Sequence, residues 1–280
     1  MRWGRAIGRF VRNKPLGATG GVLVLLLLLA AALASVLASY DPLQVVGAQR
    51  LLPPSAKHLM GTDNYGFDVF TRVLYGARVS LYVATLAVVL STALATVVGV
   101  VTGYWSGLAD MVIQRIVDAL MAFPWLVLLL SVMFLLGTSM TNLGVALGFI
   151  IGIRNSRVVR SAVVAIKENQ YFEAAHALGL SQKRIILVYV LPNVVAPIMV
   201  IATLSWGFVI LVESELSFLG FGVPPPEPSW GRMLSVSGRP YFEEAPWIAV
   251  FPGLAISMAV FGFNMLGDAL RDVLDPRLRQ

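Results

Sequence analysis

Residues 16–38 read LGATGGVLVLLLLLAAALASVLA, which is 23 residues without a single charge. At about 1.5 Å per helical residue, this stretch exceeds the ~30 Å hydrocarbon core of a bilayer. Apolar sequence then recurs along the chain, and each run is bounded by polar, charged or proline-containing sequence. The further runs lie at 79–102, 119–136, 143–153, 188–212 and 247–266. The pattern predicts an all-α polytopic membrane protein with six transmembrane helices.

The composition supports the same class. Of the 280 residues, 58% are apolar and only 13% are charged, whereas an ordinary soluble domain carries about 25% charged residues. So few charges would leave a soluble surface uncovered, and disordered chains require the opposite balance. The chain has no cysteine, which excludes disulfides, thiolate metal sites and a cysteine nucleophile. His58 and His176 stand in no metal-ligand pattern, so no metal site is expected.

The N-terminal run allows two interpretations. A basic start and the sequence Ala32-Leu33-Ala34 are typical of a secretory signal peptide with a cleavage site. The apolar centre of such a peptide spans only about 7–15 residues, however, and this run is longer. A retained first transmembrane helix over 16–39, preceded by a cytoplasmic segment over 1–15, is therefore favoured.

The remaining boundaries follow from prolines and charge. Residues 40–78 contain Pro42, Pro53 and Pro54 and are expected to form an extracytoplasmic loop. A core permease domain of five transmembrane helices is expected over 79–267, followed by a cytoplasmic tail over 268–280. Within that core, we expect a cytoplasmic segment over 167–187 and a proline-rich external loop over 213–246.

Basic residues fix the orientation. If the N-terminus lies inside, fifteen of the 21 basic residues fall in inner segments and six in outer segments. The inner set is Arg2, Arg5, Arg9, Arg12, Lys14, Arg115, Arg154, Arg157, Arg160, Lys167, Lys183, Arg184, Arg271, Arg277 and Arg279. The outer set is Arg50, Lys57, Arg72, Arg78, Arg232 and Arg239. This excess on the inside predicts that both termini are cytoplasmic.

Two groups of charges each allow two interpretations. Arg154, Arg157 and Arg160 share one broad helix face, either in the headgroup zone of an inclined helix or at the arginine-lined mouth of a substrate path. Glu213 and Glu215 lie near the outer end of the fifth span. They either mark a helix end at the interface or form an acidic rim for a cationic amine terminus.

The inner segment predicts a helix–turn–helix. Asn169 is a suitable N-cap, Glu173 would lie near the positive end of the helix dipole, and Gly179 is a natural C-terminal stop. Ser181 can cap a second helix that re-enters the membrane. The small residues of the first helix would let another backbone approach closely. They are Ala174, Ala175 and Ala177.

This segment resembles a known signature. Glu173-Ala174-Ala175, followed by Gly179 and by Leu191-Pro192, is similar to the EAA motif of the membrane subunits of bacterial ABC importers. The resemblance implies that a short helix docks in a groove of an ATPase subunit. The residues that it assigns to this coupling contact are Glu173, Ala174, Ala175, Ala177, Leu178 and Gly179.

Two outer segments narrow the family. HLMGTDNYGFDV at 58–69 resembles the H-x-x-G-T-D-x-x-G-R-D-V element of dipeptide, oligopeptide and nickel permeases, with Phe67 where the family usually has arginine. ESELSFLGFGVPPP at 213–226, closed by Ser229-Trp230-Gly231, resembles a second element of these C-type subunits. The resemblance covers nearly the whole chain. The residues taken from the first motif are Gly61, Thr62, Asp63, Gly66, Asp68 and Arg72.

The resemblance implies the fold of a type I ABC importer permease that forms half of a translocation path, in the bacterial cytoplasmic (inner) membrane. The substrate would be a di- or oligopeptide, with nickel, opines, glutathione or oligosaccharides as alternatives. The chain has no G-x-x-x-x-G-K-[ST] motif and no residues for catalysis, so ATP and Mg would be bound on partner subunits. The implied partners are a B-type permease, two ABC ATPase subunits, an extracytoplasmic substrate-binding protein and membrane lipid, with no nucleic acid. A stand-alone secondary transporter or channel is the alternative from another class.

Overall fold

The computed structural model describes residues 12, 14–45, 50–235 and 239–274. Most of the predicted N-terminal segment over 1–15, and residues 275–280 of the predicted tail, lie outside this part of the chain. Within the described residues the regular structure is helical, apart from one isolated β-bridge between Thr62 and Asp68. This confirms the predicted all-α class.

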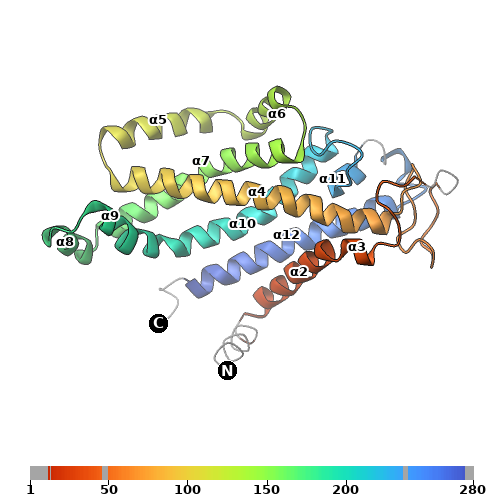
Figure 1. The fold of residues 1–280 in the computed structure, drawn as a ribbon, viewed down its shortest axis with the longest axis horizontal. Coiled ribbons are helices and arrows are strands. Elements are labelled where there is room, and N and C mark those ends of the chain that lie inside the picture. Colours follow the sequence, from red (N-terminus) through yellow and green to blue (C-terminus); the bar gives the residue numbers. More distant parts are fainter. Residues whose placement is uncertain (1–11, 13, 46–49, 236–238, 275–280) are drawn as a thin grey trace.

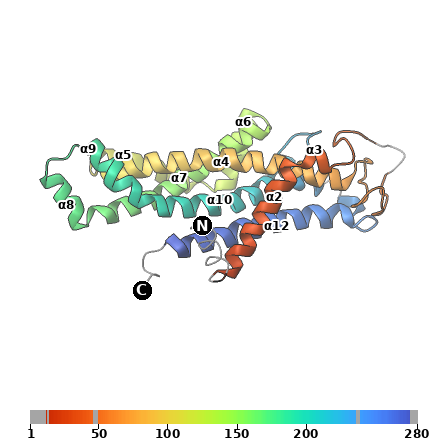
Figure 2. The ribbon, with the colours of Figure 1, turned by 60° about the horizontal axis from the view of Figure 1, so that its bottom comes forward.

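The described residues contain five long helices, four of which run along the long axis of the molecule while the first lies obliquely across the last (Figures 1 and 2). They are α2 (Pro15–Ala32), α4 (Val69–Tyr104), α7 (Met140–Lys167), α10 (Leu191–Phe218) and α12 (Trp247–Leu274). Shorter elements connect them: α3 (Ala34–Leu37), α5 (Leu108–Ala122), α6 (Trp125–Leu136), α8 (Gln170–Ala177), α9 (Gln182–Ile185), the π-helix Ile186–Val190, α11 (Trp230–Met233) and the 3-10 turn Arg239–Tyr241. Helices α8 and α9 form one end of the bundle, and the loop residues 40–45, 50–68, 219–235 and 239–246 lie at the other end.

Length and composition identify four single helices that could cross a membrane: Pro15–Ala32, Val69–Tyr104, Gln182–Phe218 and Trp247–Leu274. A fifth span results if α5 and α6, which meet at 90°, count as one broken span. Helix α7 does not qualify, because Arg154, Arg157, Arg160 and Lys167 charge its second half. The predicted number of six is therefore not established by length and composition.

The structure corrects two predicted loop boundaries. Helix α4 begins at Val69, so the predicted loop over 40–78 ends at Asp68, whose Oδ1 caps the helix by accepting a 2.8 Å hydrogen bond from Thr71 N. Helix α10 continues to Phe218, so the first residues of the predicted loop over 213–246 are helical. At both places a charged residue interrupts the apolar run, and the predicted boundary was wrongly placed because of it. Arg72 and Glu213 are instead buried within α4 and α10, where they form hydrogen bonds with neutral groups.

The third predicted span, 119–136, is also wrong as a continuous helix. Helix α5 already begins at Leu108, and the chain breaks at Phe123 and Pro124 before α6. Proline lacks the N–H that would continue a helix and forces the preceding residue out of the helical region. Phe123 accordingly has extended backbone angles (φ −78°, ψ 140°).

Helices α4 and α7 pack closely through glycines. Gly144, Gly148 and Gly152 recur every four residues on α7 and face leucines of α4. A Cβ at Gly148 would lie 2.8 Å from Leu90 Cβ, so any side chain there would push the helices apart. Small residues at this spacing let helices approach closely inside membranes.

Helix α2 crosses obliquely over α12 (Figure 2). Arg78 of α4 caps its C-terminal end, with Nε donating to Ala31 O at 2.5 Å and Nη2 to Ala32 O at 3.0 Å. At the other end, Lys14 Nζ lies 2.5 Å from Asp272 Oδ2 of α12. The first helix is thus fixed to the core at both of its ends.

Candidate functional site

Helix α8 begins at Gln170, and Asn169 occupies its N-cap position, two residues after the end of α7 at Lys167. The prediction placed Asn169 as a side-chain N-cap, but its Nδ2 instead donates to Ala165 O (3.2 Å) and Ile166 O (3.1 Å) of the preceding helix. Ser181 likewise occupies the N-cap position of α9 without a side-chain capping hydrogen bond. Both residues therefore mark the predicted helix boundaries, although the predicted capping bonds do not form.

Gly179 ends α8 as predicted. Its φ of +70° lies in the left-handed region, which favours glycine. Leu180 N donates to Ala175 O (3.3 Å) and Gly179 N donates to His176 O (2.9 Å), which are the two bonds of a Schellman motif. The chain therefore reverses sharply into α9.

One face of α8 is buried in the chain itself. Phe172 and Ala175 are 5% and 2% exposed and belong to an apolar cluster with the C-terminal ends of α4 and α7 and the start of α10. Ala175 is therefore turned away from any partner. The opposite face leaves a set of predicted coupling residues exposed, and Leu178 is 79% exposed. That set is Glu173, Ala174, Ala177 and Leu178.

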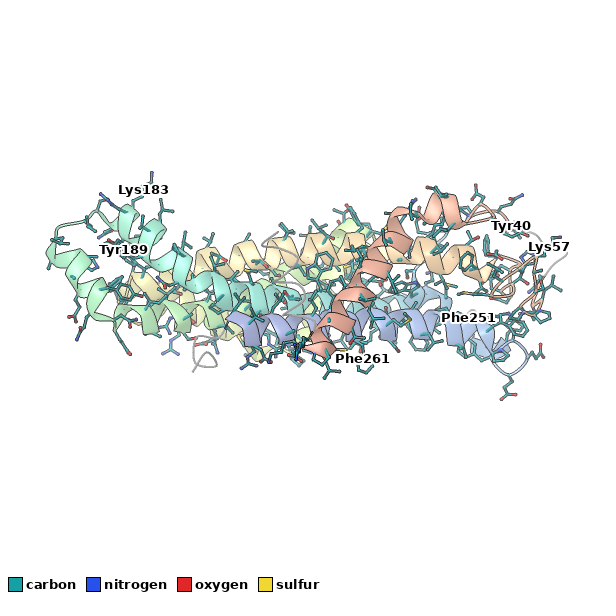
Figure 3. The ribbon with its side chains drawn as sticks, turned by 90° about the horizontal axis from the view of Figure 1, so that it is seen from below. Tyr40, Lys57, Lys183, Tyr189, Phe251 and Phe261 are labelled. Atoms are coloured by element: carbon teal, nitrogen blue, oxygen red, sulfur yellow. The ribbon has the colours of Figure 1, made fainter. Side chains whose placement is uncertain are left out.

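Aromatic contacts join α8 to the end of α4. The Tyr104 ring lies edge-on to Phe172, with 6.2 Å between centroids, and is stacked at 6.5 Å from His176. Lys167 Nζ at the end of α7 donates to Tyr104 O at 3.0 Å. The helix–turn–helix thus sits on a fixed base. Figure 3 shows Lys183 and Tyr189 at this end, opposite Tyr40 and Lys57 in the outer loops.

The three arginines of α7 are not equivalent. Arg160 forms a two-pronged ion pair with Asp110 of α5, with Nε–Oδ1 at 2.8 Å and Nη2–Oδ2 at 2.6 Å. Arg157 pairs with Asp118 of the same helix. Sequence reasoning missed both aspartates; the available signal was two acids on one amphipathic helix at 108–122.

Arg154 instead lines a cavity of about 960 Å³. The walls come from the break between α5 and α6, from α7 and from α10, and they are mostly apolar. Asn155 and Ser205 also line it, and Asn155 Nδ2 donates to Ser205 Oγ at 3.3 Å. Of the three arginines that one interpretation placed at the mouth of a substrate path, only Arg154 lines this cavity.

Glu213 and Glu215 do not form a common rim. Glu213 is fully buried between α10 and α4 and accepts hydrogen bonds from Ser80 Oγ (2.9 Å) and Ser217 Oγ (2.8 Å), whereas Glu215 is exposed. The interpretation of both as an acidic rim is therefore wrong for Glu213.

The second family element folds back over this buried carboxylate. Trp230 Nε1 donates to Val73 O of α4 at 2.9 Å, and Ser217 Oγ accepts from Val223 N at 3.1 Å. A Cβ at Gly231 would lie only 2.1 Å from Ser214 O, so α11 contacts the α10 backbone directly. The element thus joins α10, α11 and α4.

The outer motif at 58–72 is an ordered loop. Asp68 Oδ2 lies 2.9 Å from His58 Nδ1, with both side chains buried, and Thr62 O accepts from Trp247 Nε1 of α12 at 3.0 Å. Gly61 has a φ of +75°, and a Cβ there would lie 2.7 Å from Trp247 Nε1. These contacts tie the loop to the starts of α4 and α12.

Asp63 of this loop and Arg72 in the first turn of α4 are both buried. Asp63 Oδ1 accepts from Tyr65 N and Phe67 N, both at 2.9 Å, in a turn that passes through Gly66. Burial raises the pKa of the Asp63 carboxyl above its usual value, against the opposing effect of these backbone bonds and of Arg72. The Arg72 guanidinium lies 4.3 Å from the centroid of the Phe67 ring, a cation–π contact. Phe67, which stands where the family usually has arginine, therefore packs against Arg72 in this chain.

Among the described residues, no group of three or more histidine, cysteine or acidic side chains could hold a metal ion. The arrangement defines a helical membrane protein with a cavity beside its helices, an exposed helix–turn–helix at one end and ordered loops at the other.

Comparison with known proteins identifies the family. Residues 95–280 match the inner membrane component of binding-protein-dependent transport systems, and residues 2–54 match the N-terminal transmembrane domain of oligopeptide transport permease C. The chain therefore belongs to the family of binding-protein-dependent transport permeases of the inner membrane, and the predicted resemblance is confirmed.

Individual relatives span nearly the whole chain. This chain is 41% identical to a dipeptide transport system permease protein of Alkalihalophilus pseudofirmus, over 99% of this chain and 90% of the relative. It is 42% identical to a putative peptide transport system permease protein of Brucella suis, over 93% and 87% of the two chains. A glutathione transport system permease protein of Pectobacterium atrosepticum is 37% identical, over 99% and 92%.

Proposed function

We propose that this chain is the C-type permease subunit of an ATP-driven importer of di- or oligopeptides. Its full-length similarity to dipeptide and peptide permeases is the observation that carries the choice of substrate. Glutathione is the second candidate, because a full-length relative is a glutathione permease, and glutathione is itself a small peptide. Binding of dipeptides and of glutathione by the cognate substrate-binding protein separates the two.

The exposed face of α8 is the proposed contact with an ATPase subunit. Phe172 and Ala175 anchor the helix to this chain, while Ala174 and Ala177 leave room for a close approach and Leu178 offers an apolar side chain. Tyr104 joins α8 to α4, and Lys167 joins the end of α7 to the end of α4, so movement of the ATPase would be transmitted to the bundle.

The other partners complete the importer. Two ABC ATPase subunits would bind ATP and Mg and hydrolyse the nucleotide, since this chain has no P-loop. A B-type permease would supply the other half of the path, and a substrate-binding protein would deliver the peptide to the loop-covered end. In this assembly the end of the bundle that carries α8 faces the cytoplasm, and both termini are cytoplasmic. Membership in a binding-protein-dependent family favours this assembly over a stand-alone transporter or channel.

The coupling contact is tested by Ala177→Trp, with Ala109→Trp on α5 as the matched control. Both alanines are exposed, but only Ala177 lies on α8. In the whole importer, Ala177→Trp should leave the subunit in the membrane, release the ATPase subunits on purification and lower ATP-driven peptide uptake at least tenfold. Ala109→Trp should retain both properties. Normal uptake by Ala177→Trp would contradict the coupling contact.

A further inference from the structure

Helix α5 neutralises two of the three arginines of α7 and then ends. The two helices run antiparallel (Figure 1). An arginine nearer the start of α7 therefore lies beside a residue nearer the end of α5. Asp110 pairs with Arg160 and Asp118 with Arg157. At the next level α5 stops at Ala122, and the chain turns away. Among the described residues, no carboxylate lies within ion-pair distance of the Arg154 guanidinium.

The cavity beside Arg154 has the size and character of a small-ligand site. Its volume of about 960 Å³ falls within the range of ligand pockets, which are mostly apolar with a few placed polar groups. Here those polar groups are Arg154, Asn155 and Ser205, which line one side. Phe123, Trp125 and neighbouring apolar residues line much of the rest.

The position of Arg154 argues against a lipid headgroup as its partner. Arg154 lies near the middle of α7 (Met140–Lys167), roughly 20 Å from either end at about 1.5 Å per residue. Lipid phosphates lie outside the hydrocarbon core. The Arg154 side chain is exposed and has no carboxylate partner among the described residues, and such a cation on a helix of a membrane protein marks a functional position.

We propose that Arg154 binds the C-terminal carboxylate of the peptide as it passes through the permease. The planar guanidinium can donate two parallel hydrogen bonds to a carboxylate, and Asn155 and Ser205 extend the polar strip along the peptide backbone. The apolar walls accommodate side chains of varied shape. This inference rests on the proposed function, because it assumes that the substrate is a peptide.

The test uses the complete importer in proteoliposomes, with a neutral dipeptide and its C-terminal amide. Each is supplied at a concentration that saturates the substrate-binding protein, and ATPase stimulation by the loaded binding protein is recorded in parallel. The variants are Arg154→Gln, Arg154→Lys and the matched control Arg115→Gln. Arg115 is an exposed arginine of α5 that does not line the cavity.

The wild-type importer should transport the free peptide about tenfold faster than the amide, as expected when a charge-assisted hydrogen-bonded pair is lost. Arg154→Gln should lose this preference while keeping its ATPase stimulation. Arg154→Lys should restore part of the preference, and Arg115→Gln should behave as the wild type.

Four outcomes would overturn the inference. An unchanged preference in Arg154→Gln would show that the carboxylate binds elsewhere. Loss of the partner permease on purification of Arg154→Gln would assign Arg154 to the interface between subunits. Loss of bound anionic lipid, with an unchanged preference for the free peptide over the amide, would assign Arg154 to a lipid contact. A wild-type importer that transports neither form would instead contradict the proposed function, and the inference with it.

Discussion

Ser80 Oγ on α4 donates a 2.9 Å hydrogen bond to Glu213 Oε2 on α10, and both side chains are fully buried. A buried carboxylate is tolerated only when donors surround it, and Ser217 supplies a second one at 2.8 Å. This contact holds together α4 and α10 beneath the loop that Trp230 closes. Glu213 is thus part of the scaffold at the outer end of the bundle.

Glu213→Gln should therefore destabilise the subunit, while Glu215→Gln should not. Glutamine places an NH₂ group where the structure presents hydroxyl donors, and an unmatched buried polar group costs about 1–3 kcal/mol. The thermal unfolding midpoint of the purified importer in detergent checks this. Equal midpoints for the two variants would contradict the role of Glu213 in the scaffold.

Asp110 and Arg160 should be energetically coupled. Their side chains are 16% and 34% exposed, so removal of one partner leaves the other partly buried and unpaired. A double-mutant cycle with Asp110→Asn and Arg160→Gln should give a coupling free energy of about 1–3 kcal/mol, measured by chemical unfolding. Additive effects of the two substitutions would show that the pair contributes nothing to stability.

Gly148→Ala should cost more stability than Gly253→Ala. A Cβ at Gly148 meets Leu90 at 2.8 Å, whereas a Cβ at Gly253 meets nothing within 4 Å. Both changes gain similar helix propensity, so their difference reports the packing of α4 on α7, where overpacking costs about 1–3 kcal/mol. Thermal unfolding of both variants measures it, and a Gly148→Ala protein as stable as Gly253→Ala would argue against tight packing.

Gly179→Val should uncouple transport more strongly than Gly179→Asn. The left-handed backbone at φ +70° is costly for a β-branched residue but is tolerated by asparagine. No atom lies within 4 Å of the position of a Cβ, so backbone conformation rather than bulk decides the result. ATPase stimulation by the loaded binding protein is the readout. Equal stimulation in both variants would show that the turn into α9 is not required for coupling.

Asp63→Asn should make the stability of the outer loop less dependent on pH. Burial raises the pKa of this carboxyl in the folded chain, so the folded state binds a proton more tightly than the unfolded state. Stability is therefore highest below the usual value of 3.8, falls as the pH rises through the raised folded pKa, and is constant above it. Asparagine keeps the acceptor for Tyr65 N and Phe67 N but does not titrate.

The unfolding midpoint of wild type and Asp63→Asn between about pH 4 and pH 7 checks this prediction. The unfolding midpoint of Asp63→Asn should increase relative to that of the wild type as the pH rises. A difference that is independent of pH would contradict the raised pKa.

Local features of this protein were predictable from sequence. The uncharged run at 16–38 indicated a membrane protein, because length and apolarity alone decide whether a helix can span a bilayer. The end of α8 at Gly179 was predictable for the same kind of reason, since one residue sets the backbone angle there. The family motifs also identified the class, because they are contiguous in the chain.

Long-range relationships were not predictable in this way. Arg157 and Arg160 became ion pairs, and Arg154 did not, because of which helix lies beside α7 and where that helix ends. Glu213 and Glu215 look alike in sequence, yet one is buried among serines from two helices and the other is exposed. Apolar length in the sequence was enough to predict most of the long helices, and Gly179 was enough to predict where α8 stops. Only the tertiary structure decided which charges are neutralised, because the energy of a charge depends on neighbours brought by distant parts of the chain.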